Sequence, residues 1–581
     1  MPKPVPNTQT GSLTDHQHGT NDTLILADAG MGGPPLQVVL YGDAFAMYDD
    51  SRGGNDLLIG GANANNSLVG DARLIYDNAR GGNDTLIGGA GAINFLNGDV
   101  LSMYDHAHGG NDTLIGGDGA IFNFFLGDAS DMYDSSRGGN DTLIGGANTD
   151  NELFGDAFTM HGNARGGNDT LIGGANSTNN FYGDAFSMVD NARGGNDTLI
   201  AADGPSANST PALYGDANSM VDNAHGGNDT LIGGDGSTSN LYGDAFSMSG
   251  NAHGGNDTLI GGTGIGSLAS TMTLYGDASE MHDSARGGND HLTGGAGGEN
   301  LLNILVGDAG VMDGGTSGGN DTLIGGAGAF NVLYGDANEM HGAARGGNDH
   351  LIGGDGAFMN SLIGDAGTMD GDSRGGNDTL IGAASPADVV HVNVLYGDAF
   401  TLQDNARGGS DHLTGGDNSL NVLIGDAGGI AGNGRGGNDH LIGGDGSSDN
   451  TLIGDAYFMS DNARGGNDTL VSSTGTDHMW GDAQSINGVA ASPTAPTGAV
   501  VTGADTFVFA PANGNDDIND FRQSDHDRID VRAYGFHDIA DMTITADGGG
   551  NTRIAFDAND GVTLVGIADP HILHPSDFLL A

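Results

Sequence analysis

One short block, repeated through most of the chain, constrains the fold more than any other feature of the sequence. Gly-Gly-Asn-Asp, with small variations, occurs sixteen times between Asp22 and Asp468, at a mean spacing of (468 − 22)/15, or about 30 residues. A second block, Leu-Tyr-Gly-Asp-Ala and its variants, alternates with the first and occurs sixteen times between Asp43 and Asp482. Repeats of this length are typical of solenoids, in which each repeat is one structural unit that stacks on its neighbours.

Apolar residues occupy fixed positions within the repeat. The residue two after the first Asp is Leu in all sixteen copies, and the residue three before the second Asp is Leu in thirteen. The residue four after the second Asp is always apolar and is Met in twelve copies. A single repeat cannot bury these side chains, whereas stacked repeats align them into continuous rows. With Gly-Gly and Asn-Asp at the turns, the sequence predicts an all-β fold, a parallel β-solenoid of about sixteen coils with roughly 28–30 residues each.

The repeat pattern stops after Asp482, and the composition then changes. Residues 487–502 contain Pro493 and Pro496 among small residues, which is typical of a linker. From Gly503 onward, apolar residues alternate with polar ones, as they do in half-buried strands. We therefore expect four segments, which are an N-terminal segment (1–17), the solenoid repeats (18–486), the linker (487–502) and a small C-terminal β domain (503–581).

The charge balance argues against several kinds of partner. The chain has 17 Lys and Arg against 76 Asp and Glu, a formal net charge of −59, and Lys3 is its only lysine. Such a surface repels phosphate backbones, so we expect no nucleic-acid partner. No apolar run reaches the ~18 residues of a membrane span, and the N-terminus lacks the apolar stretch of a cleaved signal peptide. With no Cys for disulfides, a compact fold of this charge requires cations.

The repeated block also carries a family resemblance. Gly-Asn-Asp-Thr-Leu-Ile-Gly-Gly closely resembles the Ca²⁺-binding nonapeptide of RTX (hemolysin-type) repeat proteins, Gly-Gly-x-Gly-x-Asp-x-U-x. The segment Gly503-Ala504-Asp505-Thr506-Phe507, followed by Gly514-Asn515-Asp516, is similar to the C-terminal RTX domain of serralysin-type proteins. The resemblance implies a Ca²⁺-loaded β-roll that a type I secretion system exports by reading an uncleaved C-terminal signal. The repeats here depart from that family in length, because one coil is longer than two nonapeptides.

Two series of Asp are the candidate metal ligands. Ca²⁺ binds six to eight hard oxygen atoms, and a Gly-rich turn offers bare backbone carbonyls beside its carboxylate. Stacked turns would place multiple Ca²⁺ ions between coils, whereas the alternative is that these Asp only cap turns through local hydrogen bonds. The candidate Ca²⁺ ligands in the first block are Asp56, Asp84, Asp112, Asp141, Asp169, Asp197, Asp229, Asp257, Asp290, Asp321, Asp349, Asp378, Asp411, Asp439 and Asp468. Those in the second block are Asp71, Asp99, Asp128, Asp156, Asp184, Asp216, Asp244, Asp277, Asp308, Asp336, Asp365, Asp398, Asp426 and Asp455.

A basic position precedes each Gly-Gly-Asn-Asp block. The residue three before its Asn is Arg in eleven copies and His in four, with Ser317 in the remaining copy. We interpret this row as an Arg–Asp ladder that pairs with residues such as Asp77 and Asp190, three positions earlier. The alternative is a stripe that binds anions or a polysaccharide. The Met row is interpreted as core packing, and we find no catalytic constellation, so no enzymatic activity is expected.

These observations favour a secreted calcium-binding structural protein. We expect the acidic chain to stay unfolded in the cytosol, to fold outside the cell on binding Ca²⁺, and to self-assemble as a homo-polymer into a surface layer, filament or biofilm matrix. The expected location is extracellular or at the bacterial cell surface, after type I secretion. The alternative is a Ca²⁺-dependent adhesin or glycan-binding solenoid with a cell-surface polysaccharide as partner, in which insertions such as residues 204–211 and 385–393 cluster on one side. An enzyme built on the solenoid is a third possibility.

Overall fold

The chain forms two compact units, Met1–His291 and Leu292–Ala581. The structure, a computed structural model, describes residues 11–28, 37–204, 212–236, 238–264, 270–386, 391–446, 448–494 and 497–581. Most of the N-terminal segment and parts of the insertions at 204–211 and 385–393 lie outside the described residues, as does Pro496 of the linker. The regular elements of the described residues are β-strands and four short 3₁₀ helices.

In the first unit, each complete coil contributes one strand to each of three parallel sheets. The Leu-Ile sheet contains β2 (Thr23–Ile25), β5 (Leu57–Ile59), β8 (Thr85–Ile87), β11 (Thr113–Ile115), β14 (Thr142–Ile144), β17 (Thr170–Ile172), β20 (Thr198–Ile200), β23 (Thr230–Ile232) and β26 (Thr258–Ile260). The Leu-Tyr sheet contains β3 (Gln37–Tyr41), β6 (Asn65–Val69), β9 (Ile93–Asn97), β12 (Phe122–Leu126), β15 (Asp150–Phe154), β18 (Thr178–Tyr182), β21 (Ala212–Tyr214), β24 (Ser239–Tyr242) and β27 (Ser270–Tyr275). The Met sheet contains β1 (Ser12–Leu13), β4 (Ala46–Met47), β7 (Leu74–Ile75), β10 (Ser102–Met103), β13 (Ala129–Met132), β16 (Ala157–Met160), β19 (Ala185–Met188), β22 (Ala217–Met220), β25 (Ala245–Met248) and β28 (Ala278–Met281).

The second unit repeats this arrangement and adds elements at its C-terminal end. Its Leu-Ile sheet contains β32 (Thr322–Ile324), β35 (His350–Ile352), β38 (Thr379–Ile381), β41 (His412–Thr414), β44 (His440–Ile442), β47 (Thr469–Val471), β51 (Thr506–Val508), β53 (Arg528–Asp530) and β57 (Phe578–Leu579). Its Leu-Tyr sheet contains β30 (Leu301–Val306), β33 (Phe330–Tyr334), β36 (Met359–Ile363), β39 (Val392–Tyr396), β42 (Leu420–Ile424), β45 (Asp449–Ile453), β48 (Thr476–Trp480), β52 (Asn515–Ile518), β54 (Thr543–Ala546), β55 (Thr552–Ala555) and β56 (Gly561–Leu564). Its Met sheet contains β31 (Ala309–Met312), β34 (Ala337–Met340), β37 (Ala366–Met369), β40 (Ala399–Leu402), β43 (Ala427–Ile430), β46 (Ala456–Met459), β49 (Ala483–Ile486) and β50 (Val489–Ala490). The 3₁₀ helices are η1 (Arg532–Tyr534), η2 (Ile539–Asp541), η3 (Pro570–Ile572) and η4 (Pro575–Asp577), and β29 (His291–Thr293) lies where the two units meet in sequence.

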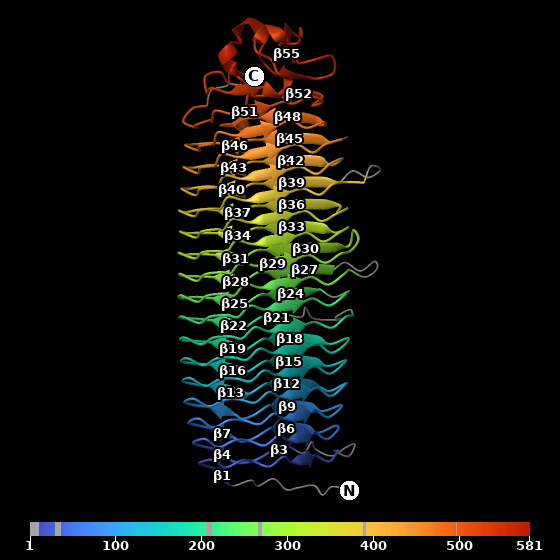
Figure 1. Ribbon diagram of the computed structural model, residues 1–581, viewed down its shortest axis with the longest axis vertical. Helices are drawn as coiled ribbons and strands as arrows, with labels where there is room; N and C mark the ends of the chain where they lie inside the picture. Colours follow the sequence, from blue (N-terminus) through green and yellow to red (C-terminus); the bar gives the residue numbers. More distant parts are fainter. Residues whose placement is uncertain are drawn as a thin grey trace. The chain divides into compact units, whose positions relative to one another are not determined.

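The strands stack in register, so equivalent residues of successive coils lie side by side. Leu86 of β8 pairs with Leu114 of β11, and Met132 of β13 pairs with Met160 of β16. Figure 1 shows the first unit's Met sheet, from β4 to β28, following one side of the stack, while β6 to β27 of the Leu-Tyr sheet follow the other. These Leu and Met side chains are fully buried. The predicted parallel β-solenoid, with its core of aligned apolar rows, is therefore confirmed.

A buried row of Asn side chains closes the turn after most Leu-Ile strands, with Ser239 and Met272 at the equivalent position in two coils. Asn66 accepts a hydrogen bond from the backbone N–H of Gly61 (3.0 Å) and donates through Nδ2 to the Gly61 carbonyl (3.0 Å). The same Nδ2 also donates to Oδ1 of Asn94 in the next coil, at 2.7 Å. Each of these amides thus satisfies backbone polar groups of its turn and hydrogen-bonds to the next coil. The aspartates of neighbouring turns therefore repeat at the same spacing from coil to coil.

The C-terminal segment continues two of the second unit's sheets. β51 pairs in parallel with β47, and β52 with β48, so the coil arrangement extends beyond residues 487–502. β53 and β57 extend the Leu-Ile sheet further in parallel, and β56 pairs in parallel with β52. The departure from the coil pattern is β54 and β55, because β54 pairs antiparallel with β55 and β55 with β56. Within the described part of the chain, no helix has the length and apolar character needed to cross a membrane.

Candidate metal centre

The two series of Asp form two buried rows beside the Leu-Ile sheet and the Leu-Tyr sheet. Each Asp of the first row immediately precedes a Leu-Ile strand, as Asp84 precedes β8. Each Asp of the second row, such as Asp71, follows a Leu-Tyr strand at the turn toward the Met sheet. All 29 candidate ligands predicted from the sequence are buried, and none is more than 3% exposed.

In the first row, one carboxylate oxygen links each coil to the preceding one. The backbone N–H of Asp56 donates to Oδ1 of Asp84 at 2.6 Å, and that of Asp84 donates to Oδ1 of Asp112 at the same distance. The second unit has the same arrangement, for example from Asp349 to Asp378 at 2.7 Å. The second oxygen, Oδ2, is buried with no hydrogen-bond partner in Asp56, Asp84, Asp112, Asp141, Asp169, Asp197, Asp229, Asp349, Asp378, Asp411, Asp439 and Asp468.

In the second row, each carboxylate accepts a hydrogen bond from the Gly-Gly turn that follows it. The backbone N–H of Gly82 donates to Oδ2 of Asp71 at 2.7 Å, and that of Gly347 donates to Oδ1 of Asp336 at 2.6 Å. One oxygen again has no partner in most of the row. These unpaired oxygens are Oδ1 of Asp71 and Asp99, and Oδ2 of Asp216, Asp244, Asp336, Asp365, Asp398, Asp426 and Asp455.

Near the start of the solenoid, the two rows converge on one compact cluster of carboxylates. Asp71, Asp84 and Asp99 each present an oxygen, and these three oxygens lie within 4.8 Å of one another. The cluster combines a second-row Asp, the first-row Asp of the same coil and the second-row Asp of the next coil. The same order of residues recurs along both units, but within the described part of the chain only this group brings three carboxylate oxygens so close together.

Burial and mutual repulsion raise the pKa of these carboxyl groups. Burial raises the pKa of Asp84 to about 8 and that of Asp141 to about 8. Burial, followed by the charges of Asp84 and Asp99, raises the pKa of Asp71 well above its ordinary value. In the second unit, burial raises the pKa of Asp426 to about 8. At neutral pH the rows therefore need protons or another cation for the fold to be stable.

The basic side chains of the described residues form their ion pairs outside the 29 candidate ligands. Among the described residues, the Arg ion pairs are those of Arg522 with Asp525 and Arg532 with Asp530, both outside the rows. The remaining ion pairs involve histidines and also lie outside the 29 candidate ligands. Protons or bound metal ions must therefore neutralise the carboxylates of the two Asp rows.

The donor atoms and the space around them fit a hard divalent cation. Every candidate ligand is a carboxylate, and the Gly turns add backbone carbonyls, which is the oxygen set that Ca²⁺ prefers. A Cβ built on Gly70 would collide with the carbonyl oxygen of Gly98 and with Oδ2 of Asp84. A Cβ on Gly81 would collide with the carboxylate of Asp99. Glycine at these positions therefore leaves oxygens of two adjacent coils facing the same small space.

The rows continue past the residues that the repeat pattern identified. The backbone N–H of Asp468 donates to Oδ1 of Asp505 at 2.8 Å, and Asp505 in turn donates to Oδ1 of Asp527 at 3.1 Å. Asp482 and Asp520 are also buried beside the Gly turns at this end. The sequence contained a sign of this extension, because Gly503-Ala504-Asp505-Thr506-Phe507 retains the Gly, Asp and Thr of the repeated block.

Comparison with known proteins adds no assignment. No protein-family model matches the chain, and no curated protein and no solved structure matches it either. The interpretation of the site therefore depends on its geometry and on the resemblance of the repeated block.

Proposed function

We propose that this chain is a secreted calcium-binding structural protein that folds when Ca²⁺ occupies the carboxylate clusters between its coils. The observation that carries the proposal is the pair of buried Asp rows, in most of whose members, those named above, one carboxylate oxygen has no hydrogen-bond partner. A buried polar atom without a partner costs about 1–3 kcal/mol, and more when it is charged. Coordination to a divalent cation removes both the unpaired oxygen and the repulsion between neighbouring carboxylates.

Calcium fits these clusters better than the other common metal ions. The clusters offer carboxylates and backbone carbonyls without a Cys or His among the candidate ligands, which disfavours zinc and copper. Mg²⁺ requires near-ideal octahedral geometry and keeps several of its waters, whereas Ca²⁺ accepts six to eight irregularly placed oxygens. The residues that would hold the ion in the first complete cluster are Asp71, Asp84 and Asp99.

Coupling of folding to Ca²⁺ suits export followed by assembly outside the cell. In the absence of Ca²⁺ at neutral pH, the rows oppose folding, so the chain remains extended in a compartment that is poor in Ca²⁺. Extracellular Ca²⁺ then folds it, because binding free energy contributes directly to folding. The resemblance to RTX proteins supports type I secretion and an extracellular or cell-surface location, and the solenoid supports a structural rather than an enzymatic role.

The first coil supports self-assembly into a surface layer, filament or matrix. Among the described residues, β2 pairs only with β5, and Leu24 is half-buried where Leu58 in the next coil is fully buried. An unpaired strand edge beside an incompletely covered apolar row can pair with another chain. At the other end, β54 and β55 continue antiparallel from β56, so that end presents a different edge.

A Ca²⁺ titration of chelator-treated protein tests both parts of the proposal. Circular dichroism follows folding while light scattering follows particle size, with Mg²⁺ and Na⁺ at matched ionic strength as controls. We expect β-structure to appear cooperatively with Ca²⁺ but not with the control ions, and particles to grow afterwards. Folding without growth would contradict self-assembly, and β-structure that is already present in chelator would contradict the role of Ca²⁺.

A further inference from the structure

A row of exposed arginines runs along each unit next to the Gly-Gly turns. In the second unit, residues from five consecutive coils are joined by parallel β-bridges, and all five side chains are exposed. These are Arg345, Arg374, Arg407, Arg435 and Arg464. The first unit has the same feature on three consecutive coils, at Arg137, Arg165 and Arg193. Neighbouring strands of a sheet lie about 4.8 Å apart, so the row presents cations at that interval.

The turn aspartates do not neutralise this row. Within the described part of the chain, no arginine of the row forms an ion pair, so the Arg–Asp ladder expected from the sequence is not observed. The nearby turn carboxylates contact backbone instead. Oδ2 of Asp134 accepts from the N–H of Asp105 at 3.2 Å, and Oδ2 of Asp190 accepts from the N–H of Gly162 at 3.1 Å. The guanidinium groups of the row are thus left facing solvent.

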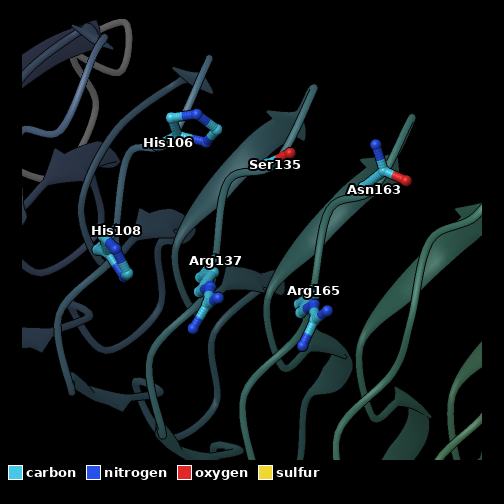
Figure 2. A pocket seen from close by; sticks show the side chains of 6 residues that line it. All are labelled: His106, His108, Ser135, Arg137, Asn163 and Arg165. Atoms are coloured by element: carbon cyan, nitrogen blue, oxygen red, sulfur yellow. The ribbon is translucent and has the colours of Figure 1, made fainter.

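Each row borders a shallow groove lined by polar side chains. In the first unit, the groove is lined by His106, His108, Ser135, Arg137, Asn163 and Arg165. Figure 2 shows these residues as two parallel lines, with His106, Ser135 and Asn163 along one line and His108, Arg137 and Arg165 along the other. The second unit has a groove at the equivalent position, lined by Ala343, Arg345, Asp372, Arg374, Asn405 and Arg407. The same groove therefore recurs in each unit as a consequence of the repeat.

We propose that these grooves bind an acidic polysaccharide, a linear chain of sugars that bear carboxylates. A guanidinium forms two parallel hydrogen bonds with a carboxylate, and a row of them suits a ligand whose anionic groups also repeat along a line. Along the other side of the first unit's groove, the His106 imidazole, Ser135 hydroxyl and Asn163 amide offer donors and acceptors for sugar hydroxyls. The second unit's groove offers the Asn405 amide and the Asp372 carboxylate there. A polymer that spans several coils gains from each weak, exposed contact.

The same groove is poorly suited to single-stranded nucleic acid, which is also a polyanion. Proteins that bind single-stranded nucleic acid stack its bases on exposed aromatic rings within a positively charged channel. The two grooves are lined by Arg, His, Ser, Asn, Ala and Asp, with no Phe, Tyr or Trp. The chain's net charge of −59 opposes both polyanions, so the missing aromatic rings are what disfavour nucleic acid.

This inference depends on the proposed function, because the arginines lie next to the Ca²⁺ clusters. Arg80 is followed by Gly81 and Gly82, the turn that faces the carboxylates of Asp71 and Asp99. With Ca²⁺ bound, the charge behind the row is neutralised, so its attraction for an anionic ligand is no longer opposed by the aspartates. Binding of the polysaccharide should therefore require Ca²⁺.

The test measures binding of a hexameric oligogalacturonate by isothermal titration calorimetry, at constant saturating Ca²⁺, with its neutral methyl ester as the matched ligand. The row variants are R137Q/R165Q/R193Q and R374Q/R407Q/R435Q, alone and combined. We expect each triple variant to bind fewer hexamers per chain, and the combined variant to bind at least about tenfold more weakly. The control, R73Q/R528Q/R532Q, makes the same charge change at exposed arginines outside the row and should bind like the wild type.

Several outcomes would overturn the inference. These are wild-type affinity in the combined variant, equal binding of the methyl ester, or tighter binding of a single-stranded oligonucleotide with the same number of charges. Circular dichroism of the same samples, with and without Ca²⁺, separates the two proposals. A circular dichroism spectrum that does not change on adding Ca²⁺ contradicts the proposed function. A wild-type protein that folds with Ca²⁺ but does not bind the hexamer contradicts only this inference.

Discussion

Replacing Asp84 by Asn should have opposite effects on the metal-free and the Ca²⁺-loaded protein. Oδ1 of Asp84 accepts the backbone N–H of Asp56 at 2.6 Å, an interaction that the Asn carbonyl oxygen can keep. Oδ2 has no hydrogen-bond partner and lies in the cluster with Asp71 and Asp99. The substitution therefore removes one buried charge while preserving the link between coils, and it places an amide NH₂ group beside two carboxylates.

The size of the effect follows from the shifted pKa. The pKa of Asp84 rises from 3.8 to about 8 in the folded chain, so the folded state holds more protons than the unfolded state between these pH values. Stability of the metal-free protein therefore falls as the pH rises through this window, by about 1.4 kcal/mol per pH unit for one such group. Between pH 3.8 and 7 the loss amounts to about 4 kcal/mol, which D84N should recover.

The assay is thermal and urea unfolding in chelator at the acidic pH values where protonated rows allow folding, repeated at pH 7 with Ca²⁺. D84N should flatten the pH dependence of the metal-free protein and raise the Ca²⁺ concentration needed for folding. The control is D77N, which makes the same charge change at an exposed turn residue outside the rows and should leave both properties unchanged. If D84N destabilises the protein equally with and without Ca²⁺, the charge of Asp84 governs neither metal-free stability nor Ca²⁺ binding, and the reasoning is refuted.

Three further sets of substitutions test the packing of the coils. In urea unfolding, G110A should destabilise the fold by about 1–3 kcal/mol or more, because the added Cβ would collide with the carbonyl oxygen of Gly82. The control G298A should be nearly neutral, because a Cβ at Gly298 meets no atom within 4 Å. N331A breaks buried hydrogen bonds to the turn and to the next coil, at 2.8–3.0 Å, and should cost roughly 2–4 kcal/mol in the same assay. M160A should lower the free energy of unfolding by about 2–5 kcal/mol, because Met160 is fully buried. M160L keeps most of the side-chain volume and should lower it by less than about 1.5 kcal/mol. Equal losses in thermal unfolding would contradict the core role of this row.

Strict periodicity made the solenoid predictable. Residues such as Leu86 and Met160 recur at fixed offsets, and only a parallel, in-register stack brings every copy into one core. The same offsets placed the 29 aspartates in two rows, because an in-register stack aligns any residue that repeats with the coil. The depth of these rows was not evident from the sequence, since aspartates in Gly-rich turns are usually exposed to solvent.

Other features depend on contacts that periodicity alone does not identify. The buried row that includes Asn66 and Asn94 was missed, although an Asn recurs five residues before many of the second-block aspartates. The Arg–Asp ladder was expected from spacing along the chain, but the turn carboxylates bind backbone N–H groups of the adjacent coil instead. In both cases a partner lies one coil away, Asn94 for Asn66 and Asp105 for Asp134, so nearness in sequence does not identify that contact.

Direct counting of bound Ca²⁺ during folding tests the central claim. Equilibrium dialysis at pH 7, combined with circular dichroism on the same samples, gives the number of ions per chain at each stage of folding. The account predicts that binding and folding follow one curve and reach on the order of one Ca²⁺ per coil, because each cluster combines oxygens of adjacent coils. A chain that is fully folded at pH 7 in chelator, or that folds with only one or two ions bound, would contradict it.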